Sequence, residues 1–101
     1  MTQSTLSIRL KQARLRAKLS QEELGIRIGL EPASARTRMN RYEVGRRVPA
    51  FELIERVASE LGLPATYFYA ATDDEAELLA QYHQLDQADK ERMLTFIKNI
   101  G

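Results

Sequence analysis

The regular occurrence of residues that begin or end helices is the feature of this sequence that most constrains its fold. Ser20 is followed three residues later by Glu23, the capping box with which a helix begins, and Gly29 is free to take the left-handed conformation that ends one. Pro32 suits the first turn of a further helix, and Gly62 provides a later stop. No segment alternates apolar and polar residues for long enough to predict a strand. The sequence therefore predicts an all-α fold.

Helical spacing of apolar residues predicts seven helical segments. The first ends near residue 18, the second spans 20–29, the third 32–43, and the fourth ends at 62; a short fifth turn spans 63–70, and the last two begin at 72 and 86. Met93, Ile97 and Ile100 have the spacing of a buried helix face. We expect residues 1–71 to form a five-helix domain and residues 72–101 a C-terminal helical hairpin, which either mediates self-association or completes the core.

Composition excludes several classes of function. The chain has no cysteine and one histidine, which excludes disulfides, thiolate nucleophiles and cysteine-containing zinc sites, and we expect no metal site. No apolar run approaches the roughly 20 residues that cross a bilayer, and the first residues lack the apolar stretch of a signal peptide, so we expect a cytoplasmic protein with no membrane partner. Without a nucleophile–base pair or a phosphate-binding loop, we expect neither an enzyme nor a cofactor.

Charge is divided unevenly along the chain. Up to Ala71 there are twelve Lys or Arg against seven Asp or Glu, and from Thr72 onward there are three against seven. The first part therefore carries a net charge of +5 and the second part −4. This division favours an N-terminal surface that faces a polyanion and a different role for the C-terminal part.

Residues 20–47 have the spacing of a helix-turn-helix. Gly25 lies four residues after Gln21 and allows two helices to approach closely, and Gly29 turns the chain four residues later. The next helix carries Met39, which we expect to face inward. A helix-turn-helix presents this second helix to the major groove of DNA.

The wider pattern resembles the lambda-repressor-like family of bacterial and phage regulators, the XRE or Cro-repressor type, over about residues 6–69. The resemblance is carried by LSQEEL and RYEVGRRVP, followed by LIERVASELG. It implies a sequence-specific DNA-binding transcriptional regulator, in particular a phage or bacterial repressor that occupies an operator.

The resemblance also assigns roles to individual residues. It implies a structural ion pair between Arg14 and Glu43, which ties the first helix to the end of the recognition helix. It places Gln21, at the start of the second helix, against a DNA phosphate, and it places Arg46 and Arg47 beside backbone phosphates.

Base contacts are expected on the outward side of the third helix. With Met39 and Tyr42 inward, Thr37, Asn40 and Arg41 face outward. An outward arginine can bind guanine through two hydrogen bonds, and asparagine can do the same for adenine. The residues assigned to DNA bases are Arg36, Thr37, Arg38, Asn40 and Arg41, with Arg36 and Arg38 toward the flanks.

The turn before the recognition helix is four residues longer than is usual in the family. Two structures account for the extra residues between Gly29 and Tyr42: either Ser34 caps a helix of normal length, or Pro32 begins a helix about one turn longer. We favour the longer helix, because proline and alanine suit its first turn. In that case Ala33 and Ser34 also enter the groove.

The C-terminal hairpin needs a surface that buries its apolar residues, among them Leu78, Leu79 and Tyr82. Ile8 and Leu15 lie on one side of the first helix, so we expect the hairpin to dock there or to pair with a second subunit. A homodimer is preferred, because two units related by a two-fold axis read half-sites about one DNA turn apart.

Two other functions stay open. The first is the antitoxin of a toxin–antitoxin pair, in which the hairpin would bind a toxin partner. The second is a helical protein-interaction module that kept the fold and lost DNA binding, although Arg36, Thr37, Asn40 and Arg41 argue against such a loss.

Overall fold

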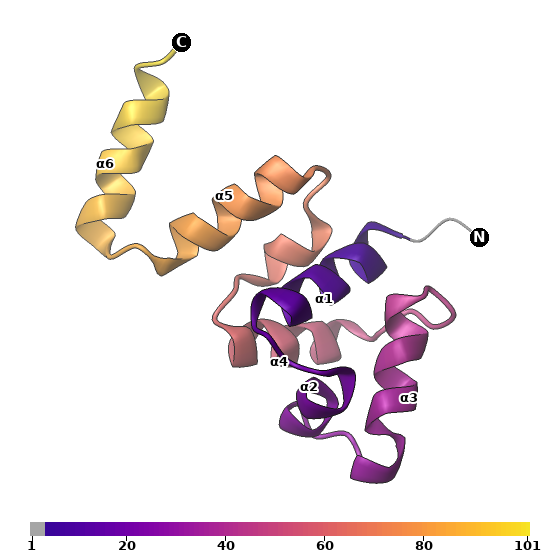
Figure 1. Ribbon diagram of the computed structural model, residues 1–101. Helices are drawn as coiled ribbons and strands as arrows, with labels where there is room; N and C mark the ends of the chain where they lie inside the picture. The colour runs from indigo at the N-terminus through magenta and orange to yellow at the C-terminus, as the bar shows by residue number, and fades with distance from the viewer. Residues whose placement is uncertain (1–3) are drawn as a thin grey trace.

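The computed structural model describes residues 4–101 and is all-helical over that range (Figure 1). These residues form six α-helices and the 3-10 helix η1: α1 (Thr5–Arg16), α2 (Gln21–Arg27), α3 (Pro32–Glu43), α4 (Phe51–Leu61), η1 (Ala65–Tyr69), α5 (Asp73–Gln84) and α6 (Gln87–Lys98). The predicted all-α fold is confirmed, with η1 as the short fifth turn. Residues 1–3 of the expected first domain lie outside the described residues. Between residues 4 and 101, no helix is long and apolar enough to cross a membrane.

Helix starts follow the polar caps in the sequence. Ser20 and Glu23 form the predicted capping box, with the Ser20 hydroxyl accepting from the Glu23 amide at 3.0 Å and the Glu23 carboxylate accepting from the Ser20 amide at 2.9 Å. Thr72 and Asp86 cap α5 and α6 with one hydrogen bond each, accepting from the amides of Glu75 and Asp89. α3 begins at Pro32, so the longer recognition helix is confirmed.

The core of the N-terminal domain, which we define as α1–α4 and η1, is built from one buried stripe on each helix. Its largest fully buried side chains are Leu10, Leu24, Met39, Ile54, Val57 and Phe68. Tyr67 meets Phe68 edge-on, with ring centroids 5.2 Å apart, so η1 closes the core. The domain thus contains most of the core, to which α5 adds Ala76 and Ala80, while Val48 and Phe51 stay exposed.

Close contact between α2 and α3 depends on Gly25. A Cβ at Gly25 would lie 2.8 Å from the Cβ of Ala35 and 3.1 Å from the Cγ of Met39, so no side chain fits between the two helices. Gly29 has a φ of +95°, a conformation that favours glycine, and it ends α2 as predicted. These two glycines fix how α3 lies across α2.

The C-terminal arm, which we define as α5 and α6, is attached to the N-terminal domain through α5 alone. Figure 1 shows α5 beside the domain and α6 projecting beyond it, at the end of the molecule away from α3. The buried residues of α5 are Ala76 and Ala80, whereas Leu78 is exposed and Tyr82 is only partly buried. Leu79 is partly buried and packs against the core, as expected, but the fully buried residues of α5 are the two small ones.

The prediction that α6 has a buried face is wrong for the single chain. No residue of α6 is buried, and Phe96, Ile97 and Ile100 are 65%, 44% and 70% exposed. Ile8 and Leu15 also remain exposed, so they do not cover the apolar residues of α6. The reason is geometric: α5 leads the chain away from α1, and α6 follows it outward (Figure 1).

A polar seam between α1 and α5 holds the arm. Arg9 is only 3% exposed; its guanidinium donates to the carbonyl of Ala70 at 3.0 and 3.2 Å, to Gln12 at 2.7 Å and to the carboxylate of Asp73. The Arg9 hydrogen bond is the main cause that lowers the pKa of the Asp73 carboxyl. About two turns further along α1 and one turn further along α5, an exposed ion pair joins Arg16 to Glu77. Docking of α5 is therefore partly ionic.

Candidate nucleic-acid interface

A buried ion pair anchors the recognition helix α3 to α1. The Arg14 guanidinium donates to the two carboxylate oxygens of Glu43 at 2.7 and 2.9 Å, and both side chains are at most 10% exposed. Arg14 also donates to the carbonyl of Leu19 at 3.0 Å. Bidentate pairing of this kind fixes both direction and distance, so the end of α3 is held rigidly against α1.

The inward and outward sides of α3 are as the sequence predicts. Ala35 and Met39 are fully buried and Tyr42 nearly so, and these three side chains form the inner face. All five residues assigned to base contacts are exposed: Arg36, Thr37, Arg38, Asn40 and Arg41. The structure therefore brings the assigned residues together on one polar surface.

One flank of that surface is a shallow hollow of about 320 Å³, lined by Gln21, Arg36, Thr37 and Asn40. The side-chain amide of Gln21 donates to Asn40 Oδ1 at 3.2 Å and to Glu43 Oε1 at 3.2 Å. The resemblance implies that Gln21 contacts a DNA phosphate. In the structure its side chain also connects the start of α2 to the outer face of α3. Asn40 is thereby oriented from a neighbouring helix.

The other flank is a hollow of about 280 Å³ lined by Arg38, Arg41, Tyr42 and Arg47. The Arg38 guanidinium donates to the Tyr42 hydroxyl at 3.3 Å. The loop after α3 folds back on the helix end, because the amides of Arg46 and Arg47 donate to the carbonyl of Arg41 at 2.9 and 3.3 Å. Gly45, with a φ of +82°, makes this reversal possible.

Arginines fall into two groups according to their partners. Six pair with an acidic side chain or a carbonyl: Arg9 with Asp73, Arg14 with Glu43, Arg16 with Glu77, Arg27 with Glu60, Arg92 with Asp89, and Arg56 with the carbonyl of Ile28. Within residues 4–101, no acidic side chain lies within ion-pair distance of the remaining five, which we call the arginine face: Arg36, Arg38, Arg41, Arg46 and Arg47. Among residues 4–101, the arginines without an acidic partner are therefore Arg56, which is hydrogen-bonded to a carbonyl, and the five on and just after α3.

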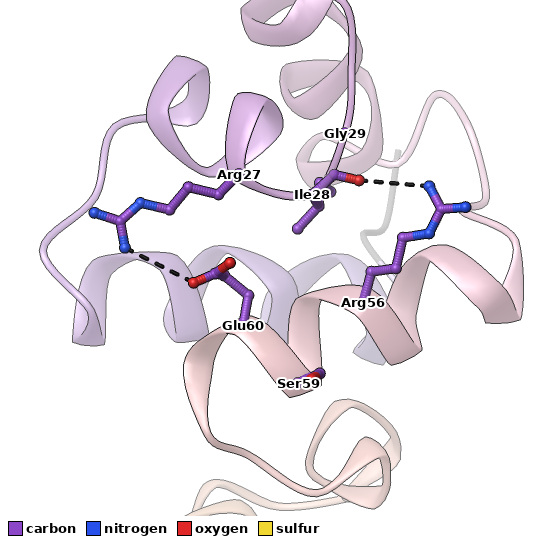
Figure 2. Close-up of a pocket in the computed structure, with 6 residues that line it drawn as sticks. All are labelled: Arg27, Ile28, Gly29, Arg56, Ser59 and Glu60. Atoms are coloured by element: carbon purple, nitrogen blue, oxygen red, sulfur yellow. Dashed lines mark hydrogen bonds and ion pairs between the residues drawn. The ribbon is translucent and has the colours of Figure 1, made fainter.

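A larger hollow behind α2 has a different character. It is lined by Arg27, Ile28, Gly29, Arg56, Ser59 and Glu60 (Figure 2). Arg56 donates to the carbonyl of Ile28 at 3.4 Å, and Arg27 lies 4.0 Å from Glu60. Both cations join α2 to α4, so this hollow supports the helix-turn-helix, and its one carboxylate balances one of its two guanidiniums. Across the described part of the chain, no three side chains of the metal-binding types gather as a metal site.

Arg9 is the residue that the sequence analysis missed. It holds the junction of η1 and α5, yet its main partners lie more than 60 positions away along the chain. Its only local signal is its place beside Leu10 on an amphipathic helix. The spacing of apolar residues along α1 predicts which side of the helix is buried. It does not predict that the guanidinium of Arg9 lies at the edge of that side.

Comparison with known proteins agrees with this geometry. A family described as a helix-turn-helix domain matches residues 5–66. The chain is also similar to the crystal structure of the transcriptional regulator BswR, with 38% sequence identity and a TM-score of 0.85 over 92% of each chain. No curated protein matches the chain.

The chain belongs to the helix-turn-helix domain family, and it is a DNA-binding transcriptional regulator. The match confirms the resemblance to lambda-repressor-like regulators drawn from residues 6–69.

Proposed function

We propose that the protein represses transcription by binding an operator with α3 in the major groove. The observation that carries this proposal is the arginine face: five guanidiniums without an acidic partner on and just after α3, whereas all but one of the other arginines form ion pairs. A surface that keeps this much unpaired positive charge on one rigid helix suits a polyanion such as duplex DNA. Occupation of a site that overlaps a promoter would block transcription.

Sequence is read by the exposed side of α3. Thr37 lies at the centre of that side, with Asn40 and Arg41 on either flank of it. Arginine pairs with guanine and asparagine with adenine, and each good pair contributes roughly 1–3 kcal/mol of discrimination. The proposed base contacts are Arg36, Thr37, Arg38, Asn40 and Arg41.

Phosphate contacts flank the helix-turn-helix. Gln21 lies at the N-terminal end of α2, where amide donors and the helix dipole favour an anion. Arg46 and Arg47 follow α3 on a loop that is hydrogen-bonded to the helix end. These contacts position the domain on the duplex without reading its sequence.

We further propose that the C-terminal arm joins two copies into a homodimer. α5 has two apolar faces: Ala76 and Ala80 pack on the domain, whereas Leu78 lies about 200° around the helix and is exposed. Together with Phe96 and Ile100 of α6, it leaves apolar surface that the single chain does not cover. A second copy of the same arm covers this surface symmetrically.

The same arm supports the antitoxin alternative, because its apolar face would also fit a toxin. Purification of the natively expressed protein distinguishes the two proposals. A homodimer without a second polypeptide supports self-association. A stoichiometric small partner bound through α6 supports the antitoxin function.

Selection of bound sites from random duplex DNA, followed by variant binding, tests the main proposal. Arg41→Ala should weaken binding mainly to the selected site. Arg46→Ala should weaken binding to all sequences and reduce the slope of log affinity against log salt by about 0.9 per lost phosphate contact. Failure of the folded protein to bind any duplex at low salt would overturn the proposal, and an equal loss on all DNA for Arg41→Ala would remove its base-reading role.

A further inference from the structure

The hollow at the C-terminal end of α3 differs from the other hollows in its lining. Its four lining side chains are three arginines and one tyrosine: Arg38, Arg41, Tyr42 and Arg47. By contrast, the hollow behind α2 includes Glu60, and the hollow between α1 and α5 includes Asp73, Asp74 and Glu77. The side chains that line the α3 hollow therefore include three positively charged hydrogen-bond donors and no carboxylate.

Two features fix these donors in place. Tyr42 belongs to the buried inner face of α3, so its hydroxyl is held by the core and receives a hydrogen bond from Arg38 Nη2 at 3.3 Å. Arg47 is brought beside the end of α3 by the hydrogen bond from its amide to the carbonyl of Arg41. The hollow thus combines side chains from a helix and from the loop that follows it.

We propose that this hollow is a binding site for a single phosphate group. Planar guanidiniums match the oxygens of a phosphate through paired N–H donors, and the Tyr42 hydroxyl provides a further donor. Arg38 and Arg47 are the main ligands. Around the circumference of α3, Arg41 is closer than Arg38 to Thr37. Arg41 therefore lies between this site and the base-reading side.

The phosphate comes either from the DNA backbone or from a free phosphate compound. In the first case the site revises one contact of the proposed function: Arg38, at the flank of the base-reading side, contacts the backbone instead of the base proposed for it above. The recognition helix is then positioned by a phosphate at its C-terminal end. In the second case a phosphorylated small molecule competes with DNA for the arginine face. Only the DNA case rests on the proposed function.

The first experiment titrates the full-length protein with inorganic phosphate, with sodium chloride adjusted to keep ionic strength constant. Arginine Nε–Hε and backbone amide signals of residues 38–47 report binding by ¹H–¹⁵N NMR. Saturable shifts are expected in the wild type, with affinity lowered roughly tenfold or more in Arg38→Gln and Arg47→Gln, because each substitution removes a hydrogen bond between two charged groups. Arg27→Gln, outside the site, should bind phosphate as the wild type does.

Tyr42→Phe provides a variant that preserves the shape of the core. It should weaken phosphate binding by less than Arg38→Gln does and leave the unfolding midpoint nearly unchanged. Absence of saturable shifts in the wild type, or equal affinity in Arg38→Gln and Arg27→Gln, overturns the proposal.

The second experiment distinguishes the two sources of phosphate. If the ligand is the DNA backbone, Arg38→Gln lowers affinity equally for selected and random duplexes and reduces the salt slope by about 0.9. If it is a free phosphate compound, Arg38→Gln loses phosphate binding but keeps the salt slope of the wild type. Should the wild type bind no duplex at all, the proposed function fails, while phosphate binding that Arg38→Gln removes still supports the site.

Discussion

The N-terminal domain and the C-terminal arm are made with the same helix-starting signals but treat their apolar residues in opposite ways. Polar caps begin α2, α5 and α6 alike. The domain buries Leu10, Met39 and Phe68 completely, whereas α6 buries nothing and leaves Phe96 and Ile100 largely exposed. Local signals therefore determine where helices form, and only the three-dimensional arrangement determines which of them is covered.

Charge separates the same two regions. The domain carries the arginine face, and the arm begins with an acidic first turn at Asp73, Asp74 and Glu75. The helix that carries most of the arginine face, α3, and the last helix of the arm, α6, lie toward opposite ends of a molecule that is 50 Å long (Figure 1). This separation allows one end to bind a polyanion while the other associates with a protein, so each can be tested without disturbing the other.

The largest expected effect comes from breaking the anchor inside the domain. Arg14→Ala removes the guanidinium from the buried carboxylate of Glu43, and the loss of one partner of a buried pair costs about 3–5 kcal/mol. We expect this decrease in the free energy of unfolding, measured by urea denaturation, together with weaker DNA binding.

Arg16→Ala is the matched control for Arg14→Ala. It lies on the same helix but pairs with Glu77 of the arm at an exposed position, so it should cost at most about 1 kcal/mol. Equal decreases in the free energy of unfolding for the two variants would contradict the distinction between the rigid domain and the solvent-accessible attachment of the arm.

A smaller effect is expected from the exposed face of the arm. Burying a phenylalanine side chain contributes about 1.5–3 kcal/mol, so Phe96→Asp should raise the dimer dissociation constant at least tenfold in sedimentation equilibrium. The helical content should stay unchanged, because Phe96 contacts little of its own chain. Thr95→Asp adds the same charge about 100° around α6 from Phe96, on the side away from Ile97 and Ile100, and should leave the dimer intact. Dissociation by both variants, or by neither, would rule out this face as the interface.

Much of the domain could be predicted because its determinants are local. The capping box at Ser20, the helix end at Gly29 and the helix start at Pro32 each depend on residues within about one helical turn. The outward side of α3 also followed once Met39 was placed inward, since helical geometry then fixes its neighbours.

The remainder depends on contacts between distant segments. Apolar spacing in α6 shows that the helix is amphipathic but does not show whether its own chain or another covers it. On α5 the buried residues are Ala76 and Ala80, because small side chains let the helix approach the domain closely. Hydrophobicity alone would instead predict that Leu78 is buried. The burial of Arg9 depends on a carbonyl and a carboxylate more than 60 positions away.

The smallest expected effect is a pH dependence of the seam between the two regions. The hydrogen bond from Arg9, followed by that from Gln12, holds the pKa of Asp73 below its ordinary value of 3.8. Because the folded-state pKa is lower than the unfolded one, the ionised carboxylate stabilises the folded state fully above that ordinary value. This contribution is lost as the pH falls through the lowered pKa.

Urea denaturation between about pH 7 and pH 2.5 measures this contribution as a difference between the wild type and Asp73→Asn. The wild type should be the more stable at neutral pH, and the difference should shrink toward zero in acid as its own carboxylate becomes protonated. Asp74→Asn removes a carboxylate from the same turn of α5 without touching Arg9, so its difference from the wild type should change less with pH. A difference for Asp73→Asn that is constant over the whole range would show that the ion pair contributes nothing to the attachment of the arm, and that the attachment depends on the packing of Ala76 and Ala80.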